Sequence, residues 1–157
     1  MGRALLIVGW LATAGLAATA VIGYLLGSTV RVLQPHLLLG LVACLLLLFS
    51  HSWVMFYLIG TGKAIKDAVN ENHLETELSE RTKDFKNRTY PWLMAAMGLA
   101  IATFVLGGGY VAGAVPSWLH VVLFYATLVV QVWALVLEGR VLLQNERLMN
   151  EINQRLA

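Results

Sequence analysis

The chain has 157 residues, of which 59% are hydrophobic and only 13% are charged. A soluble domain normally has about 25% charged residues, so the composition excludes an ordinary soluble protein and indicates a membrane protein. The formal net charge of +2 is too small to suggest nucleic-acid binding. A single cysteine, Cys44, excludes an internal disulfide framework and a multi-cysteine metal site.

Four segments have the roughly 20 consecutive apolar residues that a membrane-spanning helix needs. They cover about 4–27, 36–60, 91–112 and 117–137. The first resembles a signal peptide, but its apolar run continues past the small residues at 18–20, so we expect an uncleaved span. The sequence therefore predicts one all-α domain over 1–157, an integral membrane up-down four-helix bundle.

Three prolines support these boundaries. Pro35, Pro91 and Pro116 stand at or just before the starts of the second, third and fourth spans. Proline lacks a backbone N–H and is tolerated at a helix start, where that donor has no partner anyway. We therefore expect each of the three to mark the beginning of a helix.

The positive charges predict the orientation. Of the eleven lysines and arginines, all but Arg31 lie at the N-terminus, between spans two and three, or in the C-terminal tail. Positive residues concentrate on the cytoplasmic side of membrane proteins. We therefore expect a multi-pass protein with cytoplasmic N- and C-termini.

The polar segments are expected to form helical cytoplasmic extensions of spans two and four. The loop 63–90 has acidic and basic residues at helical spacing, and the tail 138–157 is amphipathic, with an apolar stripe of Val141, Leu148, Ile152 and Leu156. The two extensions are expected to pack together or on a partner. Small residues of span one, including Ala14 with Ala18 and Gly15 with Thr19, form a packing face within the bundle or between subunits. No internal repeat is evident.

Span four contains a line of polar residues. At about 100° per residue, Thr127, Gln131 and Glu138 all lie within about 20° of His120 around the helix. Polar groups aligned in an apolar span face protein or water rather than lipid. The line is interpreted either as a polar seam that joins helices or as part of a ligand site.

Span two offers candidate ligands. Cys44, His51 and Met55 share a face and are residue types that bind haem iron or copper. His36 and His120 begin diagonal spans at similar depth, which is how a bis-histidine haem bridges two helices. The candidate cofactor-binding residues are therefore His36, His51, His120 and Met55. The cofactor is not determined by the sequence, haem b is the leading candidate if one is bound, and whether another metal binds is left open.

His51 also has a structural interpretation. It lies about 22 Å further inward than His36 along the helix, at the level of Gln131 and Glu138. A hydrogen bond from His51 to either residue would hold spans two and four in register. A buried carboxylate beside a histidine is also suited to proton relay, because histidine titrates near neutral pH.

Two functions remain after catalytic motifs are considered. The spans contain no serine–histidine–aspartate grouping, HExxH motif or paired acids, which argues against a hydrolytic enzyme. The first function is a non-catalytic accessory or scaffold subunit that assembles with other membrane subunits or with itself in the lipid bilayer. The alternative is an electron-transfer subunit that binds haem b or a metal through intramembrane histidines.

Overall fold

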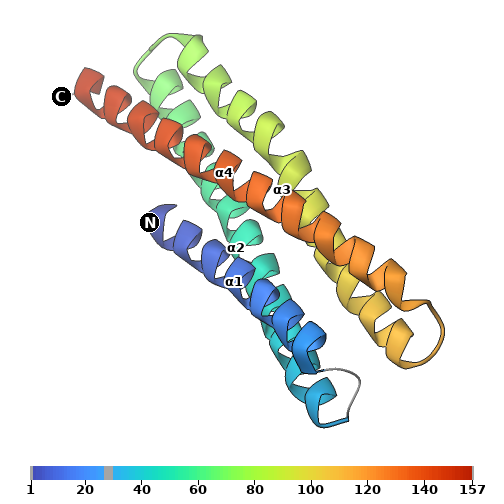
Figure 1. Cartoon of the computed structure of the whole chain (residues 1–157). Helices are drawn as coiled ribbons and strands as arrows, with labels where there is room; N and C mark the ends of the chain where they lie inside the picture. Colours follow the sequence, from blue (N-terminus) through green and yellow to red (C-terminus); the bar gives the residue numbers. More distant parts are fainter. Residues whose placement is uncertain (1, 27–29, 157) are drawn as a thin grey trace.

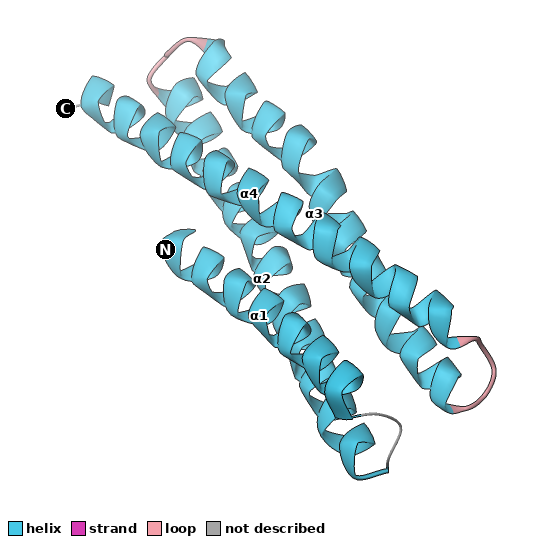
Figure 2. Cartoon of the chain, in the orientation of Figure 1, coloured by secondary structure: helices cyan, strands magenta, loops and turns pink. Residues whose placement is uncertain are grey.

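The structure, a computed structural model, describes residues 2–26 and 30–156. It contains four helices, α1 (Gly2–Leu26), α2 (Val30–Glu71), α3 (Thr76–Val111) and α4 (Ser117–Leu156). The described part of the chain has no strand (Figure 2). Each helix contains a stretch long and apolar enough to cross a membrane. The prediction of an all-α protein with four span-like helices is confirmed.

Consecutive helices run in opposite directions and form two hairpins, α1–α2 and α3–α4 (Figure 1). Across the two hairpins, α2 packs on α3 and α1 packs on α4. α2 also contacts α4. We call the end with the α1–α2 and α3–α4 connections the hairpin end. The opposite end, with the α2–α3 turn and the C-terminus, is the extension end. The two hairpins diverge towards the hairpin end (Figure 1).

Two helices are much longer than a bilayer requires. α2 has 42 residues and α4 has 40, so each is about 60 Å long, twice the roughly 30 Å of a hydrocarbon core. Both continue without interruption from the apolar stretch into the polar segment. The segment 63–90 consists of the ends of α2 and α3, joined by a turn that contains His73 in the left-handed region at φ 51°. The prediction that spans two and four extend as helices is confirmed.

The prolines do not all mark helix starts. Only Pro116 directly precedes a helix, whereas Pro35 lies inside α2 and Pro91 inside α3. The expectation is therefore wrong for Pro35 and Pro91. The apolar stretch does begin near Pro91, but the helix began earlier, because charged side chains pair along its polar turns and keep it helical. The sequence therefore changes from polar to apolar near Pro91 while the backbone remains helical.

The extension end has its own core. Val141, Leu148 and Ile152 of the tail are buried in one cluster with residues of α2 and α3, such as Ile65 and Phe85. Leu156, the last member of the predicted stripe, is exposed. The two extensions therefore pack against each other, as one of the two expectations stated.

Ion pairs close the rim of this core. Arg81 of α3 donates to Glu151 of α4 at 3.0 Å, and Arg155 of α4 donates to Glu75 at 2.7 Å. The hydrogen bond from Arg81 holds the pKa of Glu151 below its ordinary value. All these side chains are partly exposed, so the ion pairs contribute little to the free energy of unfolding and mainly fix how the helix ends are oriented.

The small residues of α1 serve mainly to bring helices close together. A Cβ on Gly15 would lie 3.1 Å from Ala43 Cβ of α2. Thr19 is buried on the same face. On a neighbouring face of α1, about 100° away around the helix, Ala14 and Ala18 are exposed.

Candidate functional site

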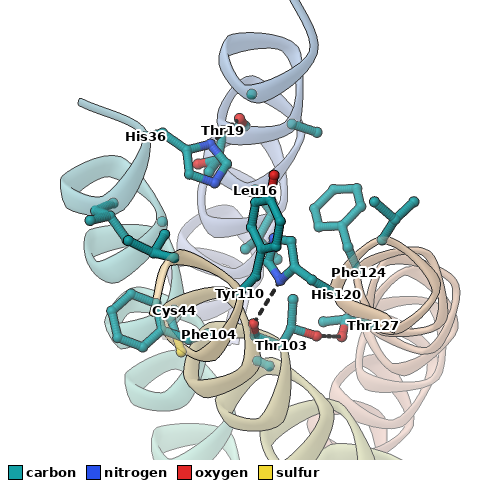
Figure 3. A pocket seen from close by; sticks show the side chains of 18 of the residues that line it. Leu16, Thr19, His36, Cys44, Thr103, Phe104, Tyr110, His120, Phe124 and Thr127 are labelled. Atoms are coloured by element: carbon teal, nitrogen blue, oxygen red, sulfur yellow. Dashed lines mark hydrogen bonds between the residues drawn. The ribbon is translucent and has the colours of Figure 1, made fainter. Parts of the chain in front are cut away.

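A cavity of about 650 Å³ lies between the two hairpins near the hairpin end, and all four helices line it. Its walls are mainly apolar, with Phe104 of α3 and Phe124 of α4 among them (Figure 3). Pockets for small molecules and cofactors measure about 300–1,000 Å³ and are mainly apolar with a few convergent polar groups. The cavity has the size and character of such a pocket.

Two histidines meet in this cavity. His36 comes from α2 and His120 from α4, and their ring centroids are 6.4 Å apart with the ring planes at 74° (Figure 3). Both residues begin the apolar part of their helices and lie at the same level. The prediction that His36 and His120 have similar depth is confirmed.

A backbone carbonyl orients each ring. His36 Nδ1 lies 2.9 Å from Thr19 O, and His120 Nδ1 lies 3.0 Å from Thr103 O (Figure 3). A carbonyl oxygen only accepts, so Nδ1 is the protonated nitrogen of both rings. In a neutral ring Nε2 then has a free lone pair, and a metal-binding histidine usually has this arrangement.

Glycines make room for the rings. A Cβ on Gly23 would lie 3.0 Å from His36 Cε1, and a Cβ on Gly107 would lie 2.9 Å from His120 Cε1. Each glycine belongs to the first helix of the hairpin whose second helix provides the histidine. Any other residue would push against the ring edge, so glycine permits the close approach.

These residues reveal a repeat that the sequence reading missed. Thr19, Gly23 and His36 have the spacing Thr-x3-Gly-x12-His, and Thr103, Gly107 and His120 have the same spacing. Corresponding residues have the same roles in the two hairpins, so the expectation that the chain has no internal repeat is wrong. Between these residues only Val21 and Val105 are identical at corresponding positions, so little else in the two segments indicates the match. A search for equal spacings around the two histidines would have found it.

The donor set of the cavity is small. In residues 2–26 and 30–156, no group of three or more histidine, cysteine or acidic side chains is arranged to hold a metal ion. Cys44 lines the cavity and is buried. The described side chains thus offer two imidazole nitrogens and one thiol, which is too few for a bare ion, whereas two imidazoles are enough for a metal whose other ligands come from a macrocycle.

His51 lies elsewhere and is fully occupied. Its Nδ1 is 2.6 Å from Glu138 Oε1 and its Nε2 is 2.7 Å from Gln131 Oε1, with all three side chains 0% exposed. Both predicted hydrogen bonds are therefore present, and His51 joins α2 to α4. Met55, one turn further along, packs against the apolar core of the extension end. Of the four candidate cofactor residues, the structure brings His36 and His120 together in the cavity and does not bring His51 and Met55 there.

The polar line of span four faces inward along its whole length. Thr127 and Thr103 form a hydroxyl–hydroxyl hydrogen bond of 2.7 Å, and Gln131 Nε2 donates to Thr13 Oγ1 at 3.2 Å. Thr127 and Gln131 are buried, as is Glu138. The line starts at the cavity with His120 and ends at the His51–Glu138 pair. It therefore includes both a helix-joining seam and one histidine of the cavity.

Comparison of the chain with protein-family models, with curated proteins and with solved structures finds no match. What the protein does must therefore be inferred from its own cavity and its own buried polar groups.

Proposed function

We propose that this chain is an electron-transfer subunit of the membrane that holds one haem b between His36 and His120. The observation that supports this most is the matched pair of imidazoles. Both have Nδ1 hydrogen-bonded to a carbonyl, and both line one apolar cavity. Haem iron receives four nitrogens from the porphyrin and binds axial histidines through the remaining positions. His36 and His120 would be those axial ligands.

The separation of the rings supports the same proposal. Two imidazoles that each bind one metal ion through Nε2 at about 2 Å have ring centres about 6.4 Å apart. The centroids of His36 and His120 are 6.4 Å apart. The Thr19 and Thr103 carbonyls would fix the ring orientation and raise the basicity of Nε2. The aromatic side chains Phe104 and Phe124 would contact the porphyrin.

The proposal includes a placement in the membrane. In an up-down four-helix bundle oriented by its positive charges, the extension end is cytoplasmic and the cavity lies in the outer half of the bilayer. Ser117, at the hairpin end of the cavity, is exposed. The apolar walls would exclude water from the iron and favour electron transfer over chemistry on a bound substrate.

Visible spectroscopy of the purified full-length protein tests this proposal. We expect about one haem per chain, with a Soret band and a sharp α-band on reduction. His36→Ala and His120→Ala should each lower the haem-to-protein ratio about tenfold or more, because each removes an axial ligand. His73→Asn is the matched control, since His73 lies exposed in the α2–α3 turn. A colourless protein that elutes as a folded species, from cells supplied with haem precursor, would contradict the proposal.

The accessory-subunit prediction has one observation in its favour. It rested on the tail stripe and on the small residues of α1, and the chain itself covers most of both surfaces. Ala14 and Ala18 nevertheless leave a flat exposed strip on α1, of the kind that another transmembrane helix approaches closely. A stable, colourless protein that co-purifies with a membrane partner would favour this second function.

A further inference from the structure

A second polar site lies in the interior, separate from the cavity. His51 is 15 residues beyond His36 on α2, which places it about 22 Å nearer the extension end. Glu138, His51 and Gln131 form a continuous hydrogen-bonded chain that ends at Thr13 of α1, and the first three are 0% exposed. Ionisable groups at such depth are expensive and mark functional sites by default.

The hydrogen bonds fix where most of the protons are. Thr13 Oγ1 donates to Gly9 O at 2.9 Å, so it accepts from the Gln131 amide nitrogen, and the Gln131 oxygen faces His51. That oxygen only accepts, so His51 Nε2 bears a proton. One further proton lies between His51 Nδ1 and Glu138 Oε1, 2.6 Å apart. On either atom it leaves the pair with zero net charge.

One oxygen of the pair is unused. Glu138 Oε2 is buried and has no hydrogen-bond partner among the described residues. The described part of the chain has two other such side-chain atoms, Thr89 Oγ1 and Asn145 Nδ2. Asn145 is seven residues beyond Glu138 on the same face of α4, towards the extension end. Its side-chain oxygen lies 3.3 Å from Thr61 Oγ1, whose hydroxyl also lies 2.9 Å from Tyr57 O. Buried polar atoms without protein partners are the places where internal water binds.

We propose that Glu138 and His51 form a proton-binding site that takes up one proton from the extension end. The proton binds Glu138 Oε2, while Nδ1–H of the imidazolium continues to donate to Oε1. The net charge of the pair rises from zero to +1, and no bond between heavy atoms changes. Loss of a proton instead would set the Nδ1 lone pair against a carboxylate, so uptake is the favourable direction of exchange. Asn145 lies on the route from the extension end.

Among the described residues, no ion pair joins Glu138 to a charged side chain other than His51. From α3, the titratable group at this level is Tyr90, whose hydroxyl donates to Met55 O at 2.9 Å. From α4, Arg140 is exposed and on another face of the helix. Among the groups of α1 that the structure describes, those at this level are the Thr13 hydroxyl and the Leu5 carbonyl, which accepts from Ser50. Among the described side chains of these helices, none is a buried cation beside Glu138.

Infrared difference spectroscopy of the full-length protein tests the proposal. As the pH is lowered, we expect the C=O stretch of a protonated carboxyl group to grow. The band should shift in protein labelled with ¹³C-glutamate and disappear in Glu138→Gln. It should remain in Glu146→Gln, because Glu146 is exposed on the same helix. Asn145→Leu should slow its appearance after a pH jump severalfold.

The chain has seven glutamates, so the label assigns the band to a glutamate but not to Glu138. Glu138→Asp provides the assignment if Glu138→Gln does not fold, because it keeps a carboxyl group and its band should no longer shift with the glutamate label. A carboxyl band insensitive to the label, or a glutamate band that does not change with pH, would overturn the proposal and leave the pair as a static contact. The measurement needs no haem. A colourless protein with a titrating Glu138 band would contradict the proposed function alone, whereas a haem-containing protein without that band would contradict the proton site alone.

Discussion

Three histidines of this chain show how neighbouring atoms decide what one residue type can do. His36 and His120 each meet a carbonyl at Nδ1, which leaves Nε2 available to a ligand. His51 meets an acceptor at both nitrogens, which leaves nothing for a metal. Two threonines likewise use different groups. The backbone carbonyl of Thr19 accepts from His36, whereas the hydroxyl of Thr127 forms a hydrogen bond with the hydroxyl of Thr103.

At the residue scale, Gly107 provides a sharp test of the cavity. In Gly107→Ala the new methyl group would lie 2.9 Å from His120 Cε1, so the ring must move and its bond to Thr103 O must weaken. We expect the haem-to-protein ratio to fall severalfold, with an altered α-band in the haem that remains. The measurement is the visible spectrum with haem quantified per chain.

Gly108→Ala is the matched control for this substitution. A Cβ there meets nothing within 4 Å, and Gly108 belongs to the same helix turn. It should leave the haem content unchanged. Equal loss in both variants would mean that helix propensity, rather than the His120 ring, governs the effect.

The helices owe their spacing to small residues at a few crossing points. α1 approaches α4 closely at Gly9, where a Cβ would lie 2.5 Å from Leu135 Cδ2 and 3.2 Å from Ser50 Oγ. Leu135 is itself 1% exposed, so it has no free space to rotate into. The hydrogen bond from Ser50 to Leu5 O ties α2 to the same part of α1.

At the element scale, Gly9→Ala should destabilise the protein. Overpacking a well-filled interior costs typically about 1–3 kcal/mol, which exceeds the roughly 0.5–1 kcal/mol that alanine gains over glycine inside a helix. The measurement is equilibrium unfolding in mixed detergent micelles. Gly60→Ala, whose Cβ would meet nothing within 4 Å, should be neutral or slightly stabilising, and a similar loss in both variants would contradict the crossing-point explanation.

At the scale of the whole molecule, the two sites lie at different levels of one helical assembly. The cavity is near the hairpin end, where the hairpins diverge, and the His51–Glu138 pair lies towards the extension end, where they pack tightly (Figure 1). The proposed haem site and the proposed proton site are therefore separated along the helix axes.

The orientation of the molecule is testable by labelling. In a Cys44→Ala background, Ala114→Cys places a thiol in the α3–α4 connection and Asn72→Cys places one in the α2–α3 turn. We expect a membrane-impermeant maleimide to label Ala114→Cys in intact cells and Asn72→Cys only after the membrane is opened. The reverse pattern would contradict a cytoplasmic extension end.

The sequence by itself determined the features that follow from periodicity and composition. Apolar runs predicted the four span-like helices, and residue spacing on one helix placed His120, Thr127, Gln131 and Glu138 on one face. Helical rise alone brought His51 to the level of Glu138, and the hydrogen bond is there. These predictions succeed because rise and rotation per residue are properties of a single helix.

Only the tertiary structure decided which histidines meet and what holds them. The acceptors of His36 and His120 are backbone carbonyls, which every residue has. The residue types at positions 19 and 103 therefore do not predict these hydrogen bonds. Gly23 and Gly107 matter because a neighbouring helix places a ring against them. Both facts depend on the distance and crossing of two helices, which the pattern within either one does not specify.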